Sequence, residues 1–127
     1  MIGERREFLR LRVRLTTIVK IVKTGRAHRA LTNDISGGGI CFRTDEDLQV
    51  GEMLDIDVQL PDRRQPVNFT AEICWCHSTT AMQRGGEEAL FEVGVHFVTI
   101  DPKERALMVQ FATMNAIPND RRQEPRT

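Results

Sequence analysis

The chain has 127 residues and a mass of 14.5 kDa, and 40% of its residues are hydrophobic. This is the size and composition of one soluble globular domain rather than of a disordered or fibrous chain. Its 18 basic and 18 acidic residues cancel, which argues against bulk attraction to DNA or to a membrane surface. The cysteines fit no disulfide framework, and no apolar run approaches the roughly 20 residues that span a bilayer. We therefore expect a cytoplasmic protein without direct membrane insertion.

The charge is unevenly distributed along the chain. Residues 1–29 hold nine Lys and Arg side chains against two Glu, whereas residues 45–72 hold eight acidic side chains against two Arg. A neutral protein with one basic end is typical of a receptor for a compact anion, rather than of a protein that coats a polyanion.

The first predicted element is a half-buried strand. From Leu11 to Ile21 the odd positions are mostly apolar and several even positions are basic, the period of two that marks a strand with one buried face. A turn around Gly25 leads to a second strand over residues 27–33. A run of three glycines and a short strand segment over residues 40–43 follow.

The same period of two predicts three further strands, over residues 54–60, 67–75 and 91–97. A turn over residues 61–64 separates the first two of these strands. A polar, glycine-containing loop over about residues 78–88 separates the last two.

Beyond residue 100 the period becomes helical. Asp101 is a candidate N-cap, followed by Pro102 at the first helical position and by Glu104, which completes a variant of the capping box. A helix is expected over residues 102–117. The side chains that would pack on the rest of the protein are Leu107, Met108, Phe111 and Met114.

These elements predict a protein of the all-β class, with strands as its main secondary structure. About six short strands followed by one α-helix indicate an antiparallel β-barrel that the helix plugs or flanks. Residues 118–127, which begin with a proline, are expected to form a disordered tail.

Two segments interrupt the strand pattern. Residues 5–10 read Arg-Arg-Glu-Phe-Leu-Arg and precede the first strand, and residues 33–39 read Asn-Asp-Ile-Ser-Gly-Gly-Gly and follow the second. The triple glycine predicts a sharp turn at which the backbone approaches something closely. Asp34 and Ser36 have short side chains that can fix such a turn.

Together, these segments resemble the two signatures of the PilZ domain family. Arg6-Glu-Phe-Leu-Arg10 matches R-x-x-x-R, and Asp34-Ile-Ser-Gly-Gly-Gly39 matches D/N-x-S-x-x-G. The resemblance covers about residues 5–97, since the family also shows counterparts of Gly51, Ile73-Cys-Trp75 and Gly94-Val-His-Phe97. It implies a six-stranded antiparallel β-barrel of PilZ type with one C-terminal helix, which binds the bacterial second messenger cyclic di-GMP.

The resemblance assigns ligand contacts to the basic segment. Arg6 and Arg10 would grip phosphate and guanine, because a guanidinium group pairs with both and also stacks on a purine ring. Arg5 is an additional cation before the first signature. In the family such an arginine often accompanies an intercalated pair of cyclic di-GMP molecules, so one bound ligand and two are both open.

The second signature supplies the rest of the implied site. Asp34 and Ser36 would receive the base edge and the amides of the turn, and Gly39 would leave room for the ligand beside the backbone. Trp75 is a candidate stacking surface. It shares parity with the apolar positions of its strand, however, which favours core packing as its main role.

The expected organisation is one PilZ domain over residues 1–117, with a flexible ligand-gripping segment at residues 1–10, the barrel at 11–100 and then the helix. We expect a receptor that relays its occupancy to an unidentified downstream protein when cyclic di-GMP orders the N-terminal segment. Arg12 and Arg14 alternate outward and are interpreted as solvated.

Other functional classes find little support in the sequence. Ser36 has no nearby base and no phosphate-binding G-x-x-x-x-G-K loop occurs, so we expect no enzyme and no cofactor apart from the ligand. We expect Cys74 and Cys76 on one face of a strand. Together with the adjacent His77, they lack the spacing of a structural zinc site. This predicts three free thiols and no metal.

Two alternatives stay open. A PilZ-like domain can serve as a protein-interaction adaptor that binds no nucleotide. A small barrel can also bind single-stranded nucleic acid, but that function favours exposed aromatic side chains on which bases stack. This chain has one Trp, no Tyr and six Phe, most of them in core parity, so we expect no nucleic-acid partner.

Overall fold

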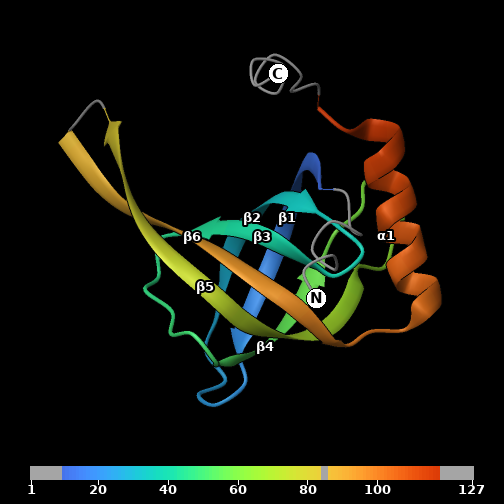
Figure 1. The fold of residues 1–127 in the computed structure, drawn as a ribbon, viewed down its shortest axis with the longest axis horizontal. Helices are drawn as coiled ribbons and strands as arrows, with labels where there is room; N and C mark the ends of the chain where they lie inside the picture. Colours follow the sequence, from blue (N-terminus) through green and yellow to red (C-terminus); the bar gives the residue numbers. More distant parts are fainter. Residues whose placement is uncertain (1–9, 84–85, 118–127) are drawn as a thin grey trace, which may run out of the picture.

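The computed structural model describes residues 10–83 and 86–117, which form six strands and one helix. The strands close into a barrel with the order β1-β2-β3-β6-β5-β4, in which all neighbours are antiparallel (Figure 1). The predicted six-stranded antiparallel barrel with a C-terminal helix is confirmed. The elements are β1 (Leu11–Ile21), β2 (Ala27–Ile35), β3 (Gly39–Thr44), β4 (Met53–Val58), β5 (Val67–Gln83), β6 (Gly86–Thr99) and α1 (Pro102–Asn115).

The barrel interior is filled by the apolar side chains that the period of two predicts. In β1 every odd position from Val13 to Ile21 is buried and every even position is exposed. Phe42 and Phe69 are among the largest fully buried side chains, and Phe69 packs edge-on against Phe97 with ring centroids 4.9 Å apart. Burial of these side chains fixes which face of each strand points outward, and hence which polar residues can form a site.

One buried position on β1 is polar. Thr17 donates a hydrogen bond to the Leu15 carbonyl at 3.0 Å, and its hydroxyl lies 2.6 Å from that of Thr32 on β2. Both threonines are fully buried. A buried hydroxyl without a hydrogen-bond partner is costly, and here the two hydroxyls form a hydrogen bond with each other across β1 and β2.

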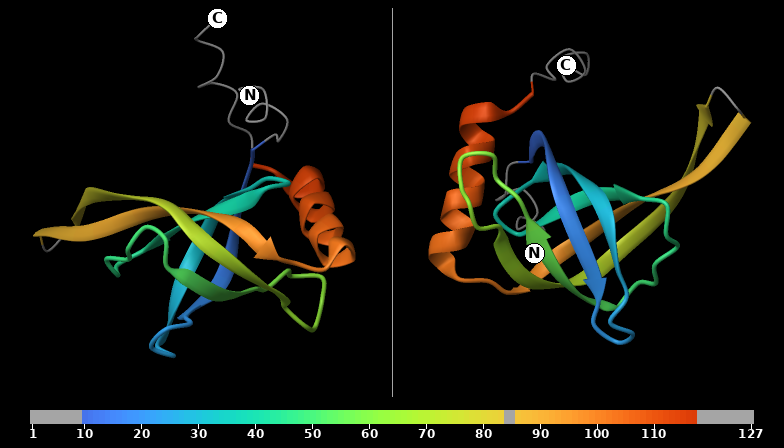
Figure 2. Two further views of the ribbon diagram at one scale, coloured as in Figure 1. Left: turned by 60° about the horizontal axis from the view of Figure 1, so that its bottom comes forward. Right: turned by 180° about the vertical axis from the view of Figure 1, so that it is seen from behind.

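The predicted polar loop over residues 78–88 is wrong. β5 and β6 continue to pair through Thr79 and Leu90 up to Gln83 and Gly86, and the resulting hairpin extends away from the barrel (Figures 1 and 2). Ser78 and Thr79 are exposed. A strand segment that covers no core needs no apolar alternation, so the sequence pattern that reveals the other strands is missing here.

The predicted turn over residues 33–39 is also shorter than expected. β2 continues to Ile35 and β3 begins at Gly39, so only residues 36–38 connect them. Asp34 therefore lies on a strand rather than in the turn.

The start of helix α1 is largely as predicted. Asp101 accepts a hydrogen bond from the Lys103 amide at 2.8 Å, and Pro102 stands at the first helical position. Glu104 forms an ion pair with Arg63 at 3.3 Å instead of completing the capping box. The helix ends at Asn115 rather than at residue 117.

The predicted buried face of α1 is partly wrong. Met108 and Ala112 are fully buried against the barrel, whereas Leu107 is 40% and Met114 72% exposed. Besides Met108 and Ala112, the half-buried side chains of Val109 and Phe111 pack against the core. Leu107 and Met114 instead line a shallow groove of about 390 Å³, which Phe111 also borders. The helix flanks the barrel (Figure 2). Within the described residues, no helix is long and apolar enough to span a membrane.

Candidate functional site

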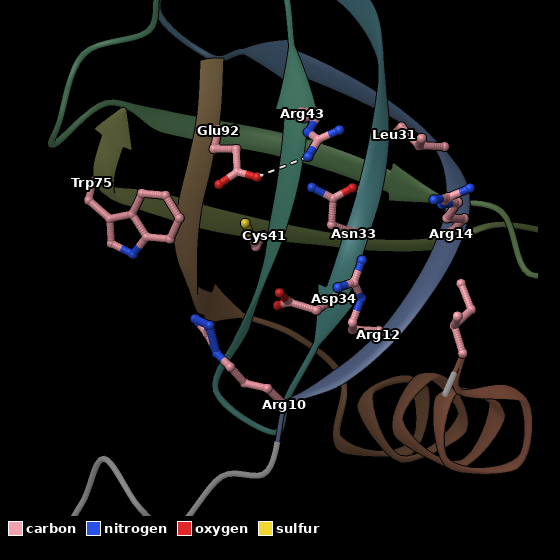
Figure 3. A pocket seen from close by; sticks show the side chains of 11 residues that line it. Arg10, Arg12, Arg14, Leu31, Asn33, Asp34, Cys41, Arg43, Trp75 and Glu92 are labelled. Carbon is pink, nitrogen blue, oxygen red and sulfur yellow. Dashed lines mark hydrogen bonds and ion pairs between the residues drawn. The ribbon is translucent and has the colours of Figure 1, made fainter. Parts of the chain in front are cut away.

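A groove of about 470 Å³ runs across the outer face of the barrel, over β1, β2, β3, β5 and β6 (Figure 3). Most of its walls are polar, because the apolar sides of these strands face the core. The side chains that line it are those of Arg10, Arg12, Arg14, Leu31, Asn33, Asp34, Cys41, Arg43, Trp75, Glu92 and Ile117.

Three arginines form one side of the groove. Arg10, Arg12 and Arg14 are exposed and follow one another on the outward positions at the start of β1. No carboxylate of the described chain lies within ion-pair distance of their guanidinium groups. The interpretation of Arg12 and Arg14 as merely solvated missed this placement, which their shared parity with Arg10 could have indicated.

Asp34 faces these arginines from β2. Partial burial raises the pKa of its carboxyl above the ordinary value, and the charge of Glu92 raises it further, while Arg10 and Arg12 oppose both effects. A half-buried carboxylate among cations is suited to accept hydrogen bonds from a ligand that carries N–H groups.

A second, smaller recess of about 170 Å³ adjoins the groove and shares Arg10, Asp34 and Trp75 with it. Ser36 lies in this recess and fixes the β2–β3 turn. Its hydroxyl accepts a hydrogen bond from the Gly38 amide at 3.2 Å and donates one to the Gly39 carbonyl at 3.3 Å. The expectation that Ser36 stabilises the turn is confirmed.

Gly39 is required by the barrel itself. A Cβ atom at this position would lie 2.9 Å from the His96 Cα and closer still to the Val95 carbonyl oxygen on β6. The close backbone approach predicted at the glycine run is therefore an approach between β3 and β6. Gly39 also borders the recess.

Trp75 does not pack in the core, contrary to the parity argument. The pairing of β5 with β6 shifts by one residue between Ile73 and Trp75. This bulge turns Trp75 to the outer face, where it lies over Gly94 and stacks on His77 with ring centroids 4.8 Å apart. A bulge reverses the inward and outward order of every residue that follows it, and so the half-buried indole lines both the groove and the recess.

Cys41 lies at the bottom of the groove, between Asp34 and the Arg43–Glu92 ion pair, which links β3 to β6 at 3.3 Å (Figure 3). Burial, together with the charges of Asp34 and Glu92, raises the pKa of the Cys41 thiol to about 12. The thiol thus stays protonated and contributes no charge to the groove.

The expectation that Cys74 and Cys76 share one strand face is wrong for the same reason as for Trp75. Cys74 is exposed, whereas Cys76 packs against the core. In the described part of the chain, no group of three or more His, Cys, Asp or Glu side chains could hold a metal ion.

The structure brings together Arg10, Asp34, Ser36, Gly39 and Trp75, which all border the recess. These are the predicted site residues that the structure describes. Arg5 and Arg6 lie outside the described residues, as do the rest of residues 1–9, predicted to be a flexible ligand-gripping segment, and the whole of the predicted tail.

Comparison with known proteins identifies the family of the chain. The PilZ domain family model matches residues 4–113 of the chain. The chain belongs to the PilZ domain family. No curated protein matches it.

Solved structures share the fold at low sequence identity. The PilZ domain of YcgR from Escherichia coli, solved with c-di-GMP, has a TM-score of 0.70 and 15% identity, with 87% of this chain and 90% of that chain covered. MrkH, a c-di-GMP-dependent transcription regulatory factor, has a TM-score of 0.69 and 16% identity, with 88% of this chain and 52% of the MrkH chain covered. The Bacillus subtilis inhibitor of motility MotI (DgrA) has a TM-score of 0.63 and 19% identity, with 87% of this chain and 50% of the MotI chain covered. This chain thus spans about half the length of the MotI and MrkH chains.

Proposed function

We propose that this PilZ domain is a receptor for cyclic di-GMP, which it binds in the groove and recess without catalysing a reaction. The observation that carries the proposal is the convergence of both signatures. Arg10 from the first signature and Asp34, Ser36 and Gly39 from the second border one recess, and Trp75 forms its aromatic wall.

The chemistry of these side chains suits a guanine dinucleotide. A guanidinium group pairs bidentately with phosphate oxygens or with guanine O6 and N7, which are roles for Arg10. The Asp34 carboxylate can accept hydrogen bonds from guanine N–H groups. The half-buried indole of Trp75 offers a stacking surface, and base–aromatic stacking is worth about 1–3 kcal/mol per base. Arg5 and Arg6 would add two cations from the segment before β1.

Calorimetric titration with cyclic di-GMP tests the proposal, with cyclic di-AMP and GTP as control ligands. We expect saturable binding of cyclic di-GMP, at one or two molecules per chain, and weaker binding of both controls. Cyclic di-AMP keeps the phosphates but lacks the guanine pattern of donors and acceptors. Equal heats for cyclic di-GMP and cyclic di-AMP would contradict a guanine-specific site.

A pair of arginine variants sharpens the test. Loss of one hydrogen bond to a charged group costs about 1.5–3 kcal/mol, so Arg10→Ala should weaken binding by at least about tenfold. Arg64→Ala removes an exposed arginine that lines neither the groove nor the recess and should leave the affinity unchanged. Unchanged binding by Arg10→Ala would instead favour the adaptor function without nucleotide.

The relay of occupancy is proposed to begin at residues 1–10, which the ligand would order across the barrel. This segment is followed by β1, in which the Arg12 carbonyl accepts a hydrogen bond from the Ile117 amide at 2.8 Å. The start of β1 is therefore tied to the residues that follow α1, and a downstream protein could sense both. Amide exchange in residues 1–10 should slow when cyclic di-GMP is added, and identical exchange with and without ligand would contradict this relay.

A further inference from the structure

Cys74, His96 and Glu72 form a cluster on the outer face of β5 and β6. Cys74 is the extra residue of the β5 bulge and is exposed. Its Sγ lies 3.0 Å from the Nδ1 of His96, and the Nε2 of the same ring lies 3.4 Å from a Glu72 carboxylate oxygen. A thiol, an imidazole and a carboxylate in this order are the arrangement in which a neighbouring base activates a cysteine.

The cluster belongs to the wall of the recess. Cys74 and His96 border the same 170 Å³ space as Arg10 and Trp75. A small molecule in this space would meet the thiol, a cation that attracts anionic groups and an aromatic surface at once. The recess thus has room for a small reagent next to the Cys74 thiol, which can act as a nucleophile.

The other two cysteines of the chain lack these features. Cys41 is buried and the pKa of its thiol is raised to about 12. Cys76 is half-buried and packs against the core. The chain therefore provides two internal controls for the reactivity of Cys74.

We propose that Cys74 is a site of thiol–disulfide exchange with small anionic disulfides. In this reaction His96 Nδ1 accepts the thiol proton while Cys74 Sγ attacks one sulfur of the disulfide. The S–S bond of the reagent breaks as a new S–S bond to Cys74 forms. The departing sulfur leaves as a thiolate and takes up the proton from His96, so that the cysteine is oxidised and the reagent is reduced.

His96 is essential to this reaction because the cysteine is not an acidic thiol by itself. Partial burial and the Glu72 charge raise the pKa of the exposed Cys74 thiol, and a backbone hydrogen bond from His96 partly opposes them. The thiol is thus protonated at rest, and exchange near neutral pH depends on a base within reach. The charged or titratable side chains next to the thiol are Glu72 and His96, and Arg10 and Asp34 border the same recess.

The modification has a consequence for ligand binding that rests on the proposed function. A mixed disulfide on Cys74 would occupy the recess beside Arg10 and Trp75, where the nucleotide is proposed to bind. Oxidation of this one cysteine would then lower the affinity for cyclic di-GMP.

Mass spectrometry of the full chain treated with oxidised glutathione, without nucleotide, tests the site. We expect one adduct, located at Cys74 by peptide mapping, absent from Cys74→Ser and formed at an unchanged rate in Cys76→Ser. His96→Ala should slow the reaction at neutral pH by at least tenfold, and alkaline pH should restore its rate. His77→Ala, which removes a neighbouring imidazole outside the cluster, should react like the natural chain.

Adduct formation on Cys76 at a rate equal to that on Cys74, or an unchanged rate in His96→Ala, would overturn the proposal. Because the reaction is followed without nucleotide, its outcome does not depend on whether the chain binds cyclic di-GMP. Calorimetry of the purified adduct then tests the link to the ligand separately, and full affinity in the adduct would refute that link.

Discussion

Gly94 is the position at which a single added methyl group should reshape the proposed ligand site. A Cβ atom there would lie 2.5 Å from Trp75 Cζ2 and closer still to Cε2 and Nε1. Ordinary contacts of a Cβ atom begin at about 3.4 Å. In Gly94→Ala the indole must therefore leave its position over β6, because the strand backbone beneath is held by pairing with both β3 and β5.

The displaced indole would lose its alignment with a base bound at the proposed site. Stacking of a base on an aromatic side chain is worth about 1–3 kcal/mol, which corresponds to a loss of affinity of about 5- to 150-fold. We expect Gly94→Ala to weaken cyclic di-GMP binding within this range. The measurement is calorimetry, after circular dichroism has shown that the variant keeps its strand content.

A double-mutant cycle isolates the cause. Trp75→Ala removes the indole, so Gly94→Ala should have no further effect on affinity in that background. Two results would refute the reasoning. One is an unchanged affinity in Gly94→Ala alone. The other is an equal loss in both backgrounds, which would mean that the methyl group acts through something other than Trp75.

Three further predictions concern stability. Met108→Ala should lower the free energy of unfolding by about 2–5 kcal/mol, since this side chain of α1 is fully buried against the barrel. Met114→Ala should change the free energy of unfolding by no more than about 0.5 kcal/mol. Urea denaturation measures both, and equal effects would contradict the observed helix face. Thr17→Val should cost about 1–3 kcal/mol in a thermal denaturation measurement, because it leaves the buried Thr32 hydroxyl without its 2.6 Å partner, and a variant as stable as the natural chain would contradict this. Asp34 has a raised pKa, so the folded state holds its proton more tightly than the unfolded state does, and this group's contribution to stability falls as the pH rises from about 4 through the raised value. Asp34→Asn should therefore be at least as stable as the natural chain at pH 7, and its unfolding free energy should depend less on pH between 4 and 7; a less stable variant would show that the carboxylate stabilises the fold.

The barrel could be predicted because its interior imposes a simple pattern. In β1 the alternation of buried and exposed positions follows the sequence without exception from Val13 to Ile21. The two signature segments also predicted residues that lie close together, since Arg10, Asp34 and Ser36 border one recess. In these regions, local sequence and long-range pairing favour the same structure.

The rest could not be predicted where pairing between distant strands decides the outcome. The bulge that turns Trp75 outward depends on how β5 pairs with β6, and nothing in the residues around Trp75 shows a shifted register. The β5–β6 hairpin extends beyond the barrel, where its strands need no alternation of apolar and polar residues. The cluster likewise joins Cys74 on β5 to His96 on β6, two residues that lie 22 positions apart in the sequence.

The central claim is that cyclic di-GMP binds across the recess formed by the two signatures. Two-dimensional NMR of the isotope-labelled chain, titrated with cyclic di-GMP, tests it most directly, because the one tryptophan of the chain gives a single indole signal. We predict saturable shifts for the Trp75 indole and for the amides of residues 34–39, with no shift in the β1–β2 turn around Gly25 at the opposite end of β1. Shifts confined to other surfaces, or none at saturating ligand, would contradict the account.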